Sequence, residues 1–140
     1  MNLSRIVVDS SAMIAILQGE PERADMVDRL NRAGEVMCST VSFVETFMVA
    51  SQRLVAFDLD NHRDFMTRFG IQSRAVDEEQ AILAAQAFMR FGKGRHPAKL
   101  NLGDCFSYAL AKSLNAPLLY KGEDFAKTDI LAAANIGARP

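Results

Sequence analysis

Cysteine, proline and tryptophan are scarce in this chain. Its two cysteines, Cys38 and Cys105, are far apart and form no CxxC motif, which argues against a disulfide framework and against a zinc site. Four prolines and eight glycines leave no low-complexity stretch, and no internal repeat is visible. Disordered and fibrous classes of protein are therefore excluded.

Long apolar runs are also missing. The longest, such as residues 11–17, fall far short of the roughly 20 residues that a membrane span needs. Residues 1–5 lead directly into a strand-like run without the basic, apolar and small-residue order of a signal peptide. We therefore expect a cytoplasmic protein without a membrane segment.

Neither sign of charge is in excess. Sixteen basic and 17 acidic residues give a net charge of -1, which lacks the basic surplus of a general nucleic-acid binder. If several acids gather in one pocket, however, the remaining surface is more basic than this total. With 140 residues, of which 49% are apolar and 24% charged, the chain is expected to form one globular domain over residues 1–140.

Strand-like and helical patterns alternate along the sequence. Short apolar runs at residues 6–8, 36–38, 71–76 and 118–120 are separated by segments with helical periodicity. This order predicts an α/β fold with a mainly parallel central sheet of four to five strands, flanked by helices on both faces. In the helix that follows Asp77, the pattern predicts that Ile82, Ala85, Phe88 and Met89 face inward.

Four acids are placed where such a sheet binds ligands. Asp9 follows the first strand, Glu45 is in the helix after the second, Asp104 begins the helix before the fourth strand, and Asp124 follows that strand. Ligands of open parallel sheets bind beyond the carboxyl ends of the strands. Carboxylates that converge there need a cation, and oxygen ligands select Mg²⁺ or Mn²⁺. Such ions are a recurrent means of hydrolysing phosphodiesters.

Each acid taken alone also has a simpler interpretation. Asp9 and Asp104 could cap helices, Glu45 could form a capping box with Ser42, and Asp124 could start a turn. Ser10 and Ser42 stand near acids, where they could orient carboxylates or cap helices.

A basic segment precedes Asp104. Its candidate contacts to an RNA backbone are Arg90, Lys93, Arg95 and Lys99, although a solvated loop explains the same residues. Four apolar side chains, Phe43, Phe47, Met48 and Phe57, are expected in the core or at a dimer contact rather than stacked on bases.

Four segments together resemble the VapC branch of the PIN-domain family, which is the toxin half of VapBC toxin–antitoxin pairs. They are IVVDSSA at residues 6–12, STVSFVE at 39–45, HPAKLNLGDCFSYALA at 96–111 and LLYKGEDFAKTDI at 118–130. The third segment is the most specific of the four.

The resemblance implies a Mg²⁺-dependent endoribonuclease, in which Mn²⁺ can substitute, that cleaves structured RNA such as tRNA or rRNA and inhibits translation. Asp9, Glu45 and Asp104 would hold the metal, and Asp124 would be the fourth acid, with Glu123 and Asp129 as competitors. A homodimer and a VapB-type antitoxin are also implied. An antitoxin helix would find an apolar groove at Phe43, Phe47 and Met48.

Two other classes of function remain open. A catalytically silent PIN-fold binding module would keep the same fold. A phospho-aspartate receiver or phosphatase also places an aspartate after the first strand. The phosphatase needs a second aspartate where this chain has Ser11, and the receiver needs a further acid near the first strand. A Rossmann or P-loop enzyme is excluded because its glycine motif is missing.

Overall fold

A computed structural model describes residues 4–133 of the chain. Its centre is a four-stranded parallel sheet in the order β3-β2-β1-β4, which confirms the predicted fold class. The strands are β1 (Arg5–Val8), β2 (Glu35–Ser39), β3 (Ile71–Arg74) and β4 (Leu118–Leu119). Residues 1–3 and 134–140 lie outside the described part, and so do the ends of the predicted 1–140 domain and the start of the segment read for a signal peptide.

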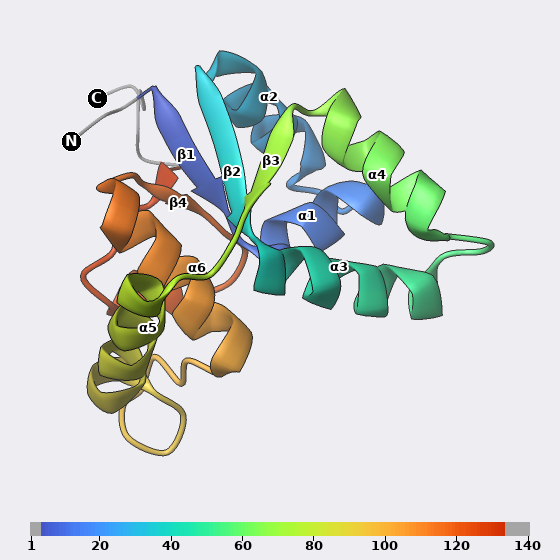
Figure 1. Ribbon diagram of the computed structural model, residues 1–140. Coiled ribbons are helices and arrows are strands. Elements are labelled where there is room, and N and C mark those ends of the chain that lie inside the picture. The colour runs from blue at the N-terminus through green and yellow to red at the C-terminus, as the bar shows by residue number, and fades with distance from the viewer. Residues whose placement is uncertain (1–3, 134–140) are drawn as a thin grey trace.

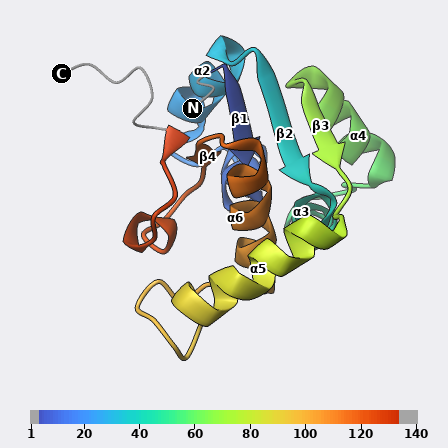
Figure 2. The ribbon, with the colours of Figure 1, turned by 60° about the vertical axis from the view of Figure 1, so that its left-hand side comes forward.

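Helices cover both faces of this sheet, as Figures 1 and 2 show. Helices α1, α2 and α4 lie on one face and α5 and α6 on the other, while α3 runs along the edge where the strands end. Within residues 4–133, no helix combines the length and apolar character needed to cross a membrane. The helices are α1 (Ser10–Leu17), α2 (Arg23–Arg32), α3 (Thr40–Arg53), α4 (Leu59–Arg68), α5 (Glu78–Phe91), α6 (Leu102–Leu114) and the 3₁₀ turn η1 (Phe125–Lys127).

The strands are apolar on both sides because both faces are buried. Ile6 and Val8 pack among α1, α2 and α4, whereas Val7, Met37 and Leu118 pack against α5 and α6. Alternate strand residues point to opposite faces, so a run such as Ile6–Val8 supplies both halves of the core. This is the pattern expected of a parallel sheet covered by helices.

The predicted inward face of α5 is wrong. Ile82, Phe88 and Met89 are 52%, 40% and 67% exposed, and Ala85 is exposed as well. The buried residues of α5 are instead Gln80, Ala84, Ala87 and Phe91. Alanines let α5 lie close against α6, which is itself rich in buried alanine. The close contact between the two helices therefore has room for Ala84 and Ala87, and the larger Ile82, Phe88 and Met89 lie on the outer surface.

The connections between strands place the chain's switch point beside β1. From β1 the chain passes to its neighbour β2 through α1 and α2 on one face. From β3 it passes through α5 and α6 on the other face to β4, the other neighbour of β1. The carboxyl ends of β1 and β4 therefore flank the position at which parallel sheets bind ligands.

Candidate functional site

Asp9 is the most deeply buried of the four predicted acids, at 1% exposure. It follows β1 and is the N-cap of α1, where its Oδ2 accepts a hydrogen bond from the Ser11 backbone N–H (3.0 Å). Its Oδ1 accepts a hydrogen bond of 2.5 Å from the Ser107 hydroxyl. The capping interpretation is therefore correct, and it coexists with a place among the other acids.

Glu45 enters the site from α3. That helix has Ser39 as its N-cap, so the alternative of a capping box between Ser42 and Glu45 is wrong. The Glu45 carboxylate accepts a hydrogen bond from Ser10 Oγ (2.6 Å), as expected for a serine that orients an acid. Burial raises the pKa of Glu45, the Ser10 hydrogen bond lowers it, and the negative charge of Asp9 raises it further, for a net upward shift.

Asp104 lies in the first turn of α6. The N-cap is Asn101 rather than Asp104 itself, and the two residues form a reciprocal capping box with N···O distances of 2.9 and 3.0 Å. Burial raises the pKa of Asp104 to about 7, against the opposing hydrogen bond from the Asn101 backbone; the charges of Asp9, Glu45 and Asp124 also raise it. The fold thus brings Asp9, Glu45 and Asp124 within electrostatic reach of Asp104.

Asp124 is the exposed member of this group and stands just before η1. Its side chain makes no capping hydrogen bond, so the turn-starting interpretation leaves its carboxylate unexplained. Glu123, the neighbouring competitor, is not among the charges that raise the pKa of Asp104. Of these two acids only Asp124 contributes to the raised pKa of Asp104, and its role as the fourth acid stays a prediction.

Asp129, the other competitor, is already occupied. It accepts hydrogen bonds from Tyr108 Oη (2.5 Å) and Lys112 Nζ (3.1 Å), and Arg90 lies 3.5 Å away. Burial alone raises the pKa of Asp129, but the Tyr108 and Lys112 hydrogen bonds lower it below its usual range. This network ties the segment after η1 to α5 and α6, and it argues against Asp129 as the fourth acid.

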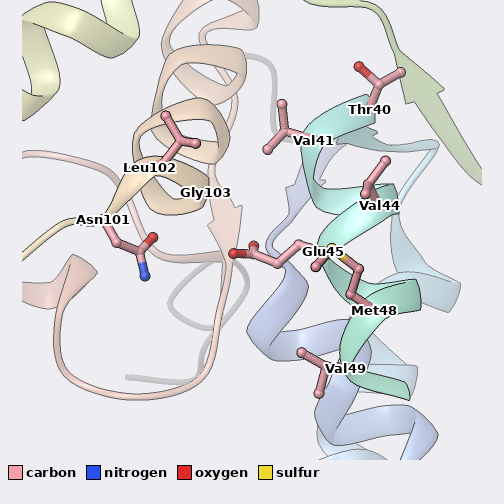
Figure 3. Close-up of a pocket in the computed structure, with 9 residues that line it drawn as sticks. All are labelled: Thr40, Val41, Val44, Glu45, Met48, Val49, Asn101, Leu102 and Gly103. Carbon is pink, nitrogen blue, oxygen red and sulfur yellow. The ribbon is translucent and has the colours of Figure 1, made fainter. Parts of the chain in front are cut away.

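Gly103 leaves room for the Glu45 carboxylate. A Cβ atom at Gly103 would lie 2.5 Å from Glu45 Oε1 and 2.7 Å from Cδ. Figure 3 shows Glu45 reaching from α3 toward the start of α6 at this point. The two helices also enclose a largely apolar pocket of about 630 Å³. It is lined by Thr40, Val41, Val44, Glu45, Met48, Val49, Asn101, Leu102 and Gly103.

The donor chemistry of this site fits a hard divalent cation. The four converging acids offer only oxygen. Burial and then the charges of neighbouring acids raise the pKa of Glu45 and Asp104, and a cation bound among these acids would favour their charged forms. In residues 4–133, however, no three acid, histidine or cysteine side chains stand close enough to enclose an ion as they are. Ser10 and the Asn101 backbone hold Glu45 and Asp104 in their present orientations.

The basic residues at the end of α5 and in the loop that leads to α6 differ in whether they already have a partner. Arg90 is paired with Asp129, and the Arg95 guanidinium stacks over Phe88 at 5.3 Å. Lys93 and Lys99 are exposed; neither forms an ion pair with any residue of the described range. The segment leads directly into Asn101, which caps the helix that carries Asp104.

The aromatic residues of α3 face away from the apolar pocket. Phe43 and Phe47 pack against the buried His62 of α4, with ring centroids 4.3 and 5.9 Å apart, and Phe57 joins the same cluster at 5.8 Å. Met48 is on another face of α3, where it lines the pocket and is 56% exposed. The predicted groove of Phe43, Phe47 and Met48 is therefore wrong as a set.

Ser107 is the site residue that the sequence analysis missed. It lies three residues after Asp104 on α6, is fully buried, and contacts both Asp9 (2.5 Å) and Ser42 Oγ (3.1 Å). Ser42 was expected near an acid, but it reaches Asp9 only through Ser107. The i,i+3 spacing from Asp104 places both residues on neighbouring parts of one helix face, and that was the available signal.

Comparisons with known proteins identify the family. The family model for the PIN domain matches residues 6–131. Ribonuclease VapC of Mycolicibacterium smegmatis is 44% identical over 131 residues, which are 91% of this chain and 98% of the relative. Ribonuclease VapC42 of Mycobacterium tuberculosis is 40% identical over 136 residues, with the same shares of the two chains.

Solved structures share the fold. The Sarcin-Ricin loop cleaving toxin VapC20 of Mycobacterium tuberculosis superposes with a TM-score of 0.69 at 18% identity, covering 90% of this chain and 96% of that one. A toxin–antitoxin complex from Klebsiella pneumoniae gives 0.67 at 16% identity, covering 89% and 92%. On the family model and the relatives above 40% identity, this chain belongs to the PIN-domain family and, within it, to the VapC ribonucleases.

Proposed function

We propose that this chain is the toxin of a toxin–antitoxin pair and acts as a Mg²⁺-dependent endoribonuclease on structured RNA, with Mn²⁺ as a substitute ion. The observation that carries the proposal is the gathering of Asp9, Glu45, Asp104 and Asp124 at the switch point of the sheet. Membership of the VapC ribonucleases supports the class of reaction. The roles of the individual acids stay predictions.

The residues of the site prepare this reaction in a definite way. Asp9 is held by two donors, Ser11 N–H and Ser107 Oγ, and each of its oxygens keeps a lone pair for a further partner. Glu45 and Asp104 would supply further carboxylate oxygens to the ion. Mg²⁺, when bound by these acids, would supply the Lewis acidity that activates water and stabilises the leaving oxygen of a phosphodiester. Hydrolysis of RNA by such a water is expected to leave products with 5′-phosphate and 3′-hydroxyl ends.

RNA would be held next to the acids by the basic segment. Lys93 and Lys99 are the best candidates for phosphate contacts, because their ammonium groups are exposed and have no ion-pair partner in residues 4–133. Arg90 and Arg95 are weaker candidates for phosphate contacts, because Arg90 is paired with Asp129 and Arg95 stacks over Phe88. Tight electrostatic contact near the metal would offset the nearly neutral total charge.

A partner that restrains the enzyme is expected to use the apolar pocket. The Klebsiella pneumoniae structure is of a toxin–antitoxin complex, and we propose a VapB-type antitoxin here. The exposed Val44, Met48 and Leu102 would receive an amphipathic helix, and an antitoxin arginine could pair with Glu45 on the pocket wall. A homodimer and a cytoplasmic location are further predictions of the family resemblance.

Induced expression tests the proposed function as a whole. Expression of this chain alone should arrest growth, co-expression with its VapB-type antitoxin should restore it, and Asp9→Asn should be harmless by itself. Growth curves and cellular RNA profiles measure these outcomes. A wild-type chain without any toxicity would favour the catalytically silent binding module, and equal toxicity of Asp9→Asn would mean that the harm is not nuclease action.

Gly103→Ala should reduce RNA cleavage by about tenfold while the protein stays folded. The added Cβ would collide with the Glu45 carboxylate, whose flexible side chain can move away but then misses its position in the site. Alanine is a better helix former than glycine, so the melting temperature should stay equal or rise. In a Glu45→Gln background the same change should cost almost nothing; a full additional loss there would show that Gly103 acts by another route.

A further inference from the structure

A chain of two serines connects α3 to the buried aspartate at the end of β1. Ser107 Oγ lies 2.5 Å from Asp9 Oδ1 and 3.1 Å from Ser42 Oγ. Both serines are fully buried, and Asp9 is 1% exposed. Three separate elements, β1, α3 and α6, therefore meet through two hydrogen bonds that solvent does not reach.

The direction of both hydrogen bonds follows from counting protons. An ionised carboxylate only accepts hydrogen bonds, so the single hydroxyl proton of Ser107 must point to Asp9. Ser107 then has no proton left for Ser42, and Ser42 must donate its own hydroxyl proton to Ser107. The order is Ser42 to Ser107 to Asp9, and hydrogen bonds that run in one direction polarise and strengthen one another.

We propose that Ser107, backed by Ser42, is a positioning residue that sets the orientation of the Asp9 carboxylate for its metal ion; this inference rests on the proposed function. The Ser11 N–H holds Oδ2 and Ser107 holds Oδ1, so rotation of the carboxylate breaks one bond or the other. The remaining lone pairs of Asp9 are fixed in direction. Groups that fix metal ligands in this way are typically worth 10- to 100-fold in metal affinity or activity, as an order of magnitude.

The test measures metal binding without RNA. Ser107→Ala should weaken the binding of Mn²⁺ to the purified full chain, followed by titration calorimetry, by about tenfold or more. Ser42→Ala should weaken it less, because Ser107 keeps its proton on Asp9 and loses only the support behind it. Ser107→Thr keeps the hydroxyl and should retain most of the affinity. Ser113→Ala is the matched control on the same helix, since Ser113 Oγ bonds only the Leu110 carbonyl.

Thermal denaturation of the metal-free proteins separates positioning from simple stability. The inference is overturned if Ser107→Ala is less stable yet binds Mn²⁺ like the wild type, because Ser107 would then only satisfy a buried acid. Wild-type affinity in a folded Ser42→Ala would overturn the inference that Ser42 supports Ser107, and this measurement stays available even if Ser107→Ala fails to fold. A wild-type protein that bound no Mn²⁺ and cut no RNA would overturn the proposed function itself and this inference with it.

Discussion

Asp104→Asn should lower the rate of RNA cleavage at least a hundredfold, which corresponds to about 2.7 kcal/mol of lost transition-state stabilisation. The change removes one negative charge from the acid cluster but keeps the oxygen that can accept the Asn101 N–H. Because three other acids raise the pKa of Asp104, loss of its charge relieves repulsion in the metal-free protein. Folding should therefore survive, and the melting temperature should not fall.

The chain provides a matched control for this change. Asp58 belongs to the other reciprocal capping box, with Asn61 at the start of α4, and it does not contribute to the raised pKa of Asp104. Asp58→Asn alters an aspartate of the same helical motif away from the acids, and its cleavage rate should equal that of the wild type. Asp9→Asn should lower the cleavage rate as much as Asp104→Asn does, and Asp124→Asn should lower it less because Asp124 is exposed. Near wild-type cleavage by Asp104→Asn would return this residue to a capping role only.

Removal of divalent metal should abolish cleavage completely, and Mg²⁺ or Mn²⁺ should restore it. The expected cause is the oxygen-only donor set, whose carboxylates repel one another until a cation is bound. A cleavage assay across a titration of EDTA and Mg²⁺ measures the effect, and analysis of the product ends accompanies it. Undiminished activity in excess chelator, or 2′,3′-cyclic phosphate ends, would point to a metal-free reaction that uses the RNA's own hydroxyl.

The metal requirement should also depend on pH. Burial, together with the neighbouring acids, raises the pKa of Asp104 in the folded chain from its ordinary value of 3.8 to about 7. At pH 6 the ion must displace a proton from Asp104, whereas at pH 8 it meets a carboxylate, so half-saturation should need more Mg²⁺ at pH 6. For the metal-free protein the sign is opposite. The stability that protonated Asp104 contributes is complete below its unfolded pKa, declines as the pH rises, and is lost above about 7.

Sequence reasoning placed the four acids near one edge of the sheet, because that position follows from the order of strands and helices along the chain. Asp9 had to follow a buried strand, and parallel strands bring their carboxyl ends to one edge. It failed for α5, where apolar residues occur on two faces of the helix and only contact with α6 decides that Ala84 and Ala87 are buried. Periodicity gives the spacing of a buried stripe, but the partner helix chooses which stripe it is.

The sequence alone could not show whether Asp124 or Asp129 is the better candidate for the fourth acid, because that depends on side-chain contacts. Asp124 and Asp129 are both aspartates and lie five residues apart in sequence, but Tyr108 and Lys112 donate hydrogen bonds only to Asp129. Ser107 was missed for a similar reason. Its partner Asp9 is 98 residues away in sequence, so the i,i+3 spacing from Asp104 could indicate a shared helix face but not the contact with Asp9.

The central position of β1 in the sheet also governs when the site comes into being. Asp9 is synthesised long before Asp124 and before β4, the strand that pairs with β1. Domains begin to fold while their chains are still being made, but a growing chain that ends at α4 has Asp9 and Glu45 without Asp104. On the proposed function, the nascent toxin is therefore harmless to the ribosome that is making it, and it gains its full set of acids only as α6, β4 and η1 leave the exit tunnel.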